Sequence, residues 1–359
     1  MKKFLKVLFL PLLAINLLGA ICLICCAYSP LLSVESMPLL SLAGLGFPFA
    51  LAINVVLLIL WLLIYPRYAM VSLVTCLICI SQIHALIPIN IGKQQPPKSS
   101  LKVLSYNILR SNVTEKNINK GNEVISYLDE ADADIICLQE FRFSALKKHK
   151  KLLKKYPYRS YQLSKDSESA SRYLCCLSKH PILSVEKIPF EKSFNGCYKY
   201  KILHESDTIV VYNCHLQTTG LKGEDRDTYE QMLSNPKESI SNEGTKNLVR
   251  KLRKSAIKRA GQIDVVMADL KGETSPYIVL CGDFNDSPIS YAHRQARKQL
   301  DDAYISSGNG LGISYNHNKM YYRIDHILYS PQFKSYKCTV DHSIKVSDHY
   351  PIYCFLKKK

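Results

Sequence analysis

The sequence predicts an α/β protein whose two β-sheets pack against each other with helices outside, preceded by about three transmembrane helices. Long apolar stretches fill the first 91 residues, and short β-type runs separated by turns begin at Leu101. Polar residues repeatedly follow those runs. We therefore divide the chain into a membrane anchor (1–91), a polar Pro-containing linker (92–100) and a larger domain (101–359).

The anchor contains three stretches that are long and apolar enough to cross a bilayer, residues 4–28, 37–65 and 69–91. The first is too long for a cleavable signal peptide, and the residues before Cys25 form no small-residue cleavage site. A buried helical hairpin of a soluble protein is the less favoured alternative. We expect an integral membrane protein whose partner is the lipid bilayer.

The positive charges in the short loops predict the orientation. Three lysines lie within the first six residues and Arg67 lies in the second loop, which places both in the cytoplasm. Three spans then put the large domain on the extracytoplasmic face. Lys93, Lys98 and Lys102 favour the opposite orientation, as do the thiols described next.

Charge and cysteine content limit what the large domain can be. After residue 91 the chain has 43 basic and 29 acidic residues, so most of the net charge of +17 lies there. This excess favours a polyanionic partner such as nucleic acid, an anionic lipid surface or a phosphorylated headgroup. A solvated basic surface without a ligand remains open. Most cysteines of the domain interrupt strand-like runs, so we expect buried thiols rather than disulfides.

The large domain begins with LKVLSYNI, an alternating strand that delivers Asn107 at its end. Residues 118–130 have helical apolar spacing, and ADIICLQEF is a buried strand that ends at Glu140. Residues 246–267 predict a long basic amphipathic helix. The charged segment 218–247, near His215, predicts a long loop, either a substrate-facing lid or a disordered insertion. The other predicted strands lie in YLCCLSKHPI, TIVVYNCHL, YIVLCGDFN, RIDHILYS and VSDHYPIYCFL.

Carboxylate, imidazole and amide side chains gather at the ends of these strands. Any one of them alone is most simply a turn, cap or structural residue. Together they predict one cleft, because residues at strand ends in a layered sheet can converge. The residues concerned are Asn107, Glu140, His215, Asp283, Asn285, Asp325, Asp348 and His349.

Six motifs in a fixed order carry a family resemblance: SYN at 105–107, LQE at 138–140, NCHL at 213–216, GDFN at 282–285, RIDHIL at 323–328 and SDHYP at 347–351. With them the domain resembles the endonuclease/exonuclease/phosphatase superfamily over essentially its whole length. The resemblance implies a four-layer α/β sandwich, two mixed β-sheets flanked by helices, with the site at one edge.

The resemblance also implies a metal site. Glu140 would bind Mg²⁺ or Mn²⁺, and Asn107 and Asp348 would complete or adjust the ligand set. A set made only of oxygen ligands favours a hard cation over zinc.

The remaining residues have implied roles in catalysis. Asp283 would position or deprotonate the attacking water, and Asn285 would hydrogen-bond the phosphate. His349 would contact the phosphoryl group or share the base role, with Asp325 orienting its ring. His215 would bind phosphate and stabilise the pentacoordinate state, or protonate the leaving group. We expect direct in-line attack by water, because no Ser or Cys is placed as an obvious nucleophile.

The sequence therefore predicts a membrane-anchored Mg²⁺- or Mn²⁺-dependent phosphoesterase. Its substrate would be a phosphate ester, either nucleic acid or a phospholipid or inositol-type headgroup, and no obligate protein partner is evident. The alternative from another class is a catalytically inactive, membrane-anchored scaffold that binds phosphate or nucleic acid.

Overall fold

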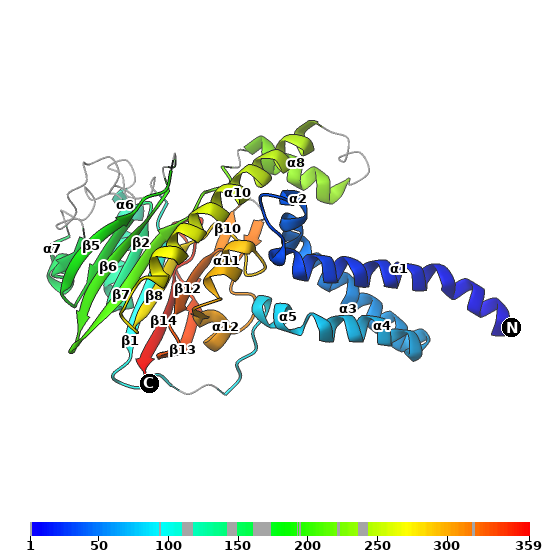
Figure 1. The fold of residues 1–359 in the computed structure, drawn as a ribbon, viewed down its shortest axis with the longest axis horizontal. Coiled ribbons are helices and arrows are strands. Elements are labelled where there is room, and N and C mark those ends of the chain that lie inside the picture. Colours follow the sequence, from blue (N-terminus) through cyan, green and yellow to red (C-terminus); the bar gives the residue numbers. More distant parts are fainter. Residues whose placement is uncertain are drawn as a thin grey trace.

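Two six-stranded β-sheets form the centre of the computed structural model (Figure 1). The structure describes residues 2–92, 95–109, 118–141, 149–160, 174–191, 193, 195–220, 223–235, 243–317 and 320–359.

The first sheet has the strand order β13-β14-β1-β2-β4-β3. β1 and β2 are parallel, and the other neighbours are antiparallel, so the sheet is mixed. Its strands are β1 (Leu101–Asn107), β2 (Ile135–Gln139), β3 (Tyr158–Arg159), β4 (Leu174–Ser178), β13 (Phe333–Val340) and β14 (Ile352–Lys358).

The second sheet has the order β5-β6-β7-β8-β12-β9, in which only β7 and β8 are parallel. Its strands are β5 (Ile182–Ile188), β6 (Gly196–His204), β7 (Asp207–His215), β8 (Ile278–Asp283), β9 (Asp301–Asp302) and β12 (Asp325–Tyr329). A short hairpin, β10 (Tyr315–His317) with β11 (Met320–Tyr322), stands apart from both sheets.

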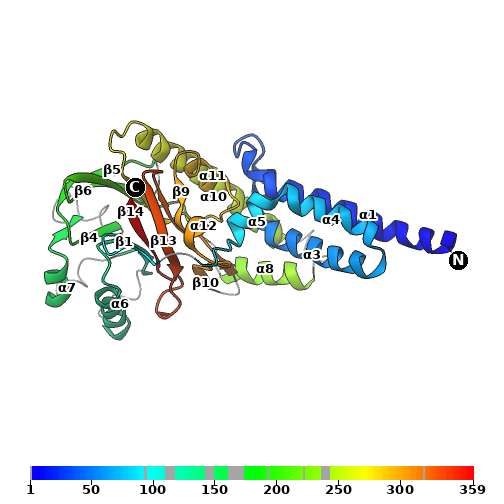
Figure 2. The same ribbon diagram turned by 90° about the horizontal axis from the view of Figure 1, so that it is seen from below.

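Alternating side chains along each strand build the layers. Val103 of β1 faces the core between the two sheets, whereas Leu104 faces α6 (Ile118–Ala131) on the outer side. On the second sheet Val211 of β7 faces inward, and Val210 packs with the residues of α10 (Glu243–Lys271). Figure 2 shows the helices on opposite outer sides of the paired sheets. The predicted four-layer α/β sandwich is confirmed.

Three shorter helices complete the domain: α7 (Lys150–Lys155), α11 (Tyr291–Ala296) and α12 (Ala303–Ser307). α7 lies on the side of α6, and α11 on the side of α10 (Figure 2). The cysteines of both the anchor and the sandwich are free thiols.

The N-terminal segments form a helical bundle beside the sandwich (Figure 1). Two helical segments, Phe9–Leu31 and Pro38–Ile64, are long and apolar enough to cross a membrane. The third expected span is a pair of helices bent by 66°, so it is either one broken span or a re-entrant loop. The elements are α1 (Lys2–Tyr28), η1 (Ser29–Leu31), α2 (Pro38–Ser41), η2 (Leu42–Gly46), α3 (Phe47–Ile64), α4 (Pro66–Ile78) and α5 (Ile80–Leu86).

The bundle and the sandwich share an interface. Asn90 donates through Nδ2 to the carbonyl of Ile305 at 3.0 Å and to that of Gly308 at 2.6 Å. Buried Arg323 donates to the carbonyls of Ala85 and Leu86 at the end of α5. The Arg323 bonds pair the last carbonyls of α5 with a cation, which stabilises the contact between the bundle and the sandwich.

Gly44 sits at the tightest point of this interface. A Cβ on Gly44 would lie 2.1 Å from the carbonyl oxygen of Ile289, which is backbone and cannot turn away. We therefore expect Gly44→Ala to destabilise the full-length protein by about 1–3 kcal/mol, the usual cost of overpacking.

The unfolding midpoint of full-length protein in lipid nanodiscs measures this effect. Gly46→Ala is the matched control, because its Cβ would meet only the sulfur of Cys26 at an ordinary 3.6 Å. Equal stability of the two variants would show that the contact between η2 and Ile289 does not form.

Candidate active site

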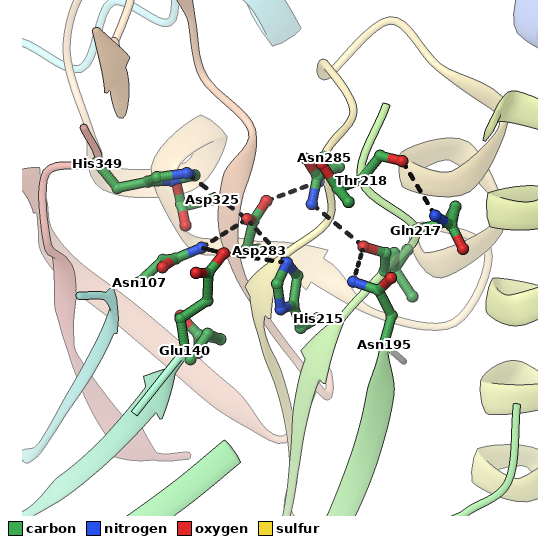
Figure 3. A network of polar contacts seen from close by, with 12 residues as sticks. Asn107, Glu140, Asn195, His215, Gln217, Thr218, Asp283, Asn285, Asp325 and His349 are labelled. Atoms are coloured by element: carbon green, nitrogen blue, oxygen red, sulfur yellow. Dashed lines mark hydrogen bonds and ion pairs between the residues drawn. The ribbon is translucent and has the colours of Figure 1, made fainter. Parts of the chain in front are cut away.

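Strands from both sheets end at the same edge of the sandwich and carry the predicted residues there (Figure 3). Asn107 ends β1, and Glu140 directly follows β2, its parallel neighbour. In the other sheet His215 and Asp283 are paired in register at the ends of β7 and β8. Asp325 begins the antiparallel β12 and pairs with Asp283. The topology alone therefore brings these five side chains together.

Asp283 is the centre of the cluster and is buried. Its Oδ2 accepts from Asn107 Nδ2 at 3.0 Å and lies 3.5 Å from His215 Nε2 and 3.7 Å from His349 Nε2. Its Oδ1 accepts from the backbone N–H of Asn285 at 2.8 Å. A carboxylate with these donors is fixed in orientation.

His349 and Asp325 form a buried pair, with Nδ1 of the imidazole 2.8 Å from Oδ2 of the carboxylate. Burial opposes the charge on His349, but the charges of Asp325 and Asp283 outweigh burial and raise the pKa of His349 to about 10. At neutral pH the ring is therefore an imidazolium. Its Nε2 faces Asp283 and the pocket, so it offers a positive donor to an anionic substrate.

Removing the Asp325 charge should lower the pKa of His349. In metal-free protein we expect the ring of wild-type His349 to stay protonated as the pH rises past 6.5 and to titrate near 10. In Asp325→Asn we expect the proton to be lost at lower pH, because the carboxylate that is hydrogen-bonded to the ring is gone.

Ring-nitrogen chemical shifts from NMR measure this titration. Asp301→Asn is the control, since Asp301 is exposed on β9. A wild-type His349 that titrates near 6.5 would contradict the geometry of the pair.

Glu140 lies at the pocket, with its side chain about a fifth exposed. Its Oε1 is 3.4 Å from Asn107 Nδ2 and 4.0 Å from His215 Nε2. Glu140 and Asn285 both have left-handed backbone conformations, with φ of 54° and 51°. Such conformations cost free energy in residues with side chains and concentrate at functional sites.

The side chains suit a hard cation, because carboxylate oxygens dominate. Glu140 and Asp348 line the same pocket, and Asp348 lies beside Ser347, whose hydroxyl is 3.4 Å from Asp348 Oδ1. Ligand atoms of Asp283, Asp325 and His349 lie within 4.8 Å of one another. That triad is already joined by its own ion pair, so Glu140 and Asp348 are the better candidates.

Two predicted amides make hydrogen bonds within the protein at the site. Asn107 directs Nδ2 at Glu140 and Asp283, while its Oδ1 accepts from the backbone of Leu109 at 3.1 Å. It thus acts here as a donor that holds the two acids. Asn285 lines the pocket, and its Nδ2 donates to the carbonyl of Leu216 at 3.1 Å, which fixes the loop after β7.

Gly282 of the GDFN motif is required by close packing of β8 on β7. Its φ is 134°, and a Cβ would lie 1.9 Å from the carbonyl oxygen of Cys214. Only glycine permits this approach, which sets Asp283 beside His215.

Buried amides that the sequence reasoning missed hold the two sheets in register. Gln139 donates through Nε2 to Asn213 Oδ1 at 2.8 Å, and Asn213 donates to the carbonyls of Leu138 and Cys175 at 3.2 Å each. Gln139 directly precedes Glu140, and Asn213 lies two positions before His215. Each amide lies inside a motif that also holds a candidate catalytic residue, and this position could have indicated a structural role for it.

Another correction concerns the segment expected to be a long loop at 218–247. The structure has α8 (Gly223–Ser234) there, and α10 already begins at Glu243. Residues 221–222 and 236–242 lie outside the described residues. Tyr229 of α8 reaches Tyr322 of the β10–β11 hairpin, with the two hydroxyls 3.2 Å apart. This contact gives a charged sequence the tertiary support that its composition did not reveal.

The converging side chains line a pocket of about 600 Å³. It contains Glu140, His215, Asp283, Asn285, Asp348 and His349. A larger cavity of about 1080 Å³, between the linker and β13, contains none of them. Charged oxygens, an imidazolium and amide donors in one pocket suit the stabilisation of a phosphoryl group and the activation of water.

Comparison with known proteins agrees with this chemistry. The family model described as Endonuclease/Exonuclease/phosphatase family matches residues 104–349, and a model of a domain of unknown function matches residues 5–86. A search of curated proteins finds no match.

Solved structures share the fold at low identity. A humanized TDP2 of D. rerio is 16% identical, with a TM-score of 0.53, over 73% of this chain and 100% of that one. TDP2 of D. rerio complexed with single strand DNA product is 17% identical, with a TM-score of 0.52 over the same shares. SmcL is also 17% identical over those shares, with a TM-score of 0.51.

The family match covers more than half of the chain and includes every predicted site residue. It does not include the anchor. The chain belongs to the endonuclease/exonuclease/phosphatase family, whose enzymes hydrolyse phosphoester bonds and are generally metal-dependent.

Proposed function

We propose that this chain is a membrane-anchored, divalent-metal-dependent phosphoesterase that hydrolyses its substrate by in-line attack of water. The observation that carries the proposal is the convergence of Asn107, His215 and His349 on the buried carboxylate of Asp283, with Glu140 beside them. Family membership supports the same reaction class.

The residues divide the work by charge and position. Asp283, fixed by its donors, would orient the attacking water and take its proton. The His349 imidazolium would bind a non-bridging phosphoryl oxygen, and His215 would stabilise the developing charge or protonate the leaving oxygen. Asp325 would keep His349 charged. Glu140 and Asp348 would hold Mg²⁺ or Mn²⁺, which when bound supplies Lewis-acid stabilisation of the phosphoryl oxygens.

The arrangement of the anchor supports the extracytoplasmic orientation that the loop charges predicted. Figure 1 marks the N-terminus at the end of the bundle farthest from the sandwich, and the start of α4, which contains Arg67, lies toward the same end. α4 and α5 then return to the sandwich. By the positive-inside rule, positive charges at the far end would put that end in the cytoplasm and the catalytic domain outside. We keep 1–91 as anchor, 92–100 as linker and 101–359 as catalytic domain.

Two substrate classes fit the reaction, nucleic acid and the phosphoester headgroup of a lipid. One similar protein, TDP2 of D. rerio, was crystallised with a single strand DNA product. The net positive charge of this chain would serve either polyanion.

A metal-exchange assay on full-length protein in detergent tests the proposal. The substrate is bis(p-nitrophenyl) phosphate, and the panel adds p-nitrophenyl phosphate, oligonucleotides and phospholipid vesicles. We expect hydrolysis to stop after chelation and to return with Mg²⁺ or Mn²⁺. Absence of hydrolysis of every substrate with either metal would favour the inactive phosphate-binding scaffold.

A further inference from the structure

We propose that the substrate is a phosphoester lipid taken from the bilayer around the anchor, with its phosphate at the catalytic residues and its acyl chain along an apolar wall that the anchor supplies. This inference rests on the proposed phosphoesterase function and names its substrate class. The apolar wall is defined here as Leu39, Leu42, Phe49, Met232, Leu248 and Leu252.

The pocket joins two chemically distinct ends. Its polar end holds Glu140, Asp283 and His349, and the same continuous space is lined by the apolar wall. A phosphate flanked by long hydrocarbon chains matches such a pocket, because each part meets surface of its own polarity.

The apolar wall comes from parts of the chain far apart in sequence. Leu39 and Leu42 belong to α2 and η2, and Phe49 to α3, while Met232 lies on α8. α10 contacts α2 and η2, so the anchor and the catalytic domain share this wall. The membrane anchor therefore completes the substrate pocket. A segment that served only as a tether would not need to line the pocket.

The wall also reaches the surface that faces lipid. Leu39 and Phe49 line the pocket and are still 57% and 50% exposed. Both lie in the segment Pro38–Ile64, which is long and apolar enough to span a membrane. A lipid could pass from the bilayer into the pocket along these side chains without exposing its acyl chain to water.

Exposed cations lie on the adjoining half of α10. Lys246, Arg250, Arg253 and Lys254 are exposed, and they share that part of the helix with Leu248 and Leu252. Basic residues beside an apolar entry attract the anionic headgroups of a bilayer surface. Positive charge near the membrane and hydrocarbon contact inside the pocket point to the same class of ligand.

A nucleic acid uses this pocket less well. Beyond the scissile phosphate, a polymer needs cations for the neighbouring phosphates and rings that stack on its bases. The three tyrosines of the lining are engaged within the protein: the hydroxyls of Tyr229 and Tyr322 lie 3.2 Å apart, and the ring of Tyr315 packs edge-on against His349. Arg259, the lining arginine, is buried and paired with Asp286 at 3.1 Å.

Chain length tests the inference in full-length protein reconstituted in nanodiscs with Mg²⁺. Release of the headgroup from dioleoyl and dibutyryl phosphatidylglycerol is compared, because only the acyl chains differ. We expect a preference of about tenfold or more in kcat/KM for the dioleoyl form, in line with the value of apolar contacts in specificity pockets.

Two matched pairs of variants locate the preference. Leu39→Asn and Phe49→Asn should each lower this preference by about tenfold. Leu40→Asn and Ile53→Asn are the controls, since these residues are 57% and 54% exposed and lie outside the pocket lining. Equal effects of Leu39→Asn and Leu40→Asn, or faster turnover of an oligonucleotide than of dioleoyl lipid, would overturn the inference.

Photolabelling distinguishes failure of the lipid-site inference from failure of the proposed phosphoesterase function. A diazirine on the acyl chain of phosphatidylglycerol should label peptides of α8 and α10 that contain Met232 and Leu252, and Phe49→Asn should reduce that labelling. Hydrolysis of the soluble diester without such labelling would reject the lipid site and leave the phosphoesterase. Labelling without hydrolysis of any diester would reject the phosphoesterase and leave a lipid-binding pocket.

Discussion

Asp283→Asn should lower kcat/KM for phosphodiester hydrolysis by about a thousandfold or more, because the group that orients and deprotonates water becomes a neutral amide. The side chain keeps its size. The remaining side-chain oxygen can still accept from the backbone N–H of Asn285, so the fold should be retained. Initial rates with bis(p-nitrophenyl) phosphate and Mg²⁺, at matched protein concentration, measure the loss.

Asp301→Asn is a suitable control, since it removes an exposed aspartate of the same sheet, on its edge strand β9. It should keep wild-type activity. A loss of only about tenfold in Asp283→Asn would place the general base elsewhere.

Glu140→Gln should abolish metal-dependent turnover while the protein stays folded. The substitution keeps the left-handed backbone at residue 140 and removes only the negative charge that would hold the cation. We expect the Mg²⁺ concentration for half-maximal activity to rise by about a hundredfold or beyond the measurable range, as loss of a charged ligand implies.

The control for this variant is Glu205→Gln. Glu205 is another glutamate with positive φ, 57°, but it lies in the exposed turn between β6 and β7. Its Mg²⁺ dependence should match the wild type. Unchanged Mg²⁺ dependence in Glu140→Gln would remove Glu140 as the metal ligand.

Much of the sandwich could be predicted from local sequence, because buried strands and amphipathic helices leave strong patterns. The helix expected at 118–130 is α6, and the long basic helix expected at 246–267 is α10, extended at both ends. The strand runs ending at Asn107 and Glu140 are β1 and β2. The site residues followed from one topological fact, that neighbouring strands of both sheets end at one edge.

What could not be predicted depended on contacts between distant segments. α8 has few apolar residues, and its support comes from the ion pair of Asp225 with Lys251 of α10 and from the Tyr229–Tyr322 contact across 93 positions of sequence. The Gln139–Asn213 hydrogen bond joins the two sheets, and no local sequence pattern predicts how those sheets pack. The bend between α4 and α5 likewise lies inside a stretch that is apolar enough to read as one span.

The role of the anchor was the largest omission. Its sequence predicted only a tether, because apolar composition is enough to explain a membrane span. The structure sets Leu39 and Phe49 on the same pocket as Asp283. Only the docking of α2 and η2 on the sandwich reveals that placement.

The most direct measurement is a crystal or cryo-EM structure of the full chain solved with Mg²⁺ and inorganic phosphate. The account predicts a cation on Glu140 and a phosphate within hydrogen-bond reach of His215 and His349, beside Asp283. A phosphate bound on a different surface, or Glu140 and His349 facing separate clefts, would contradict it.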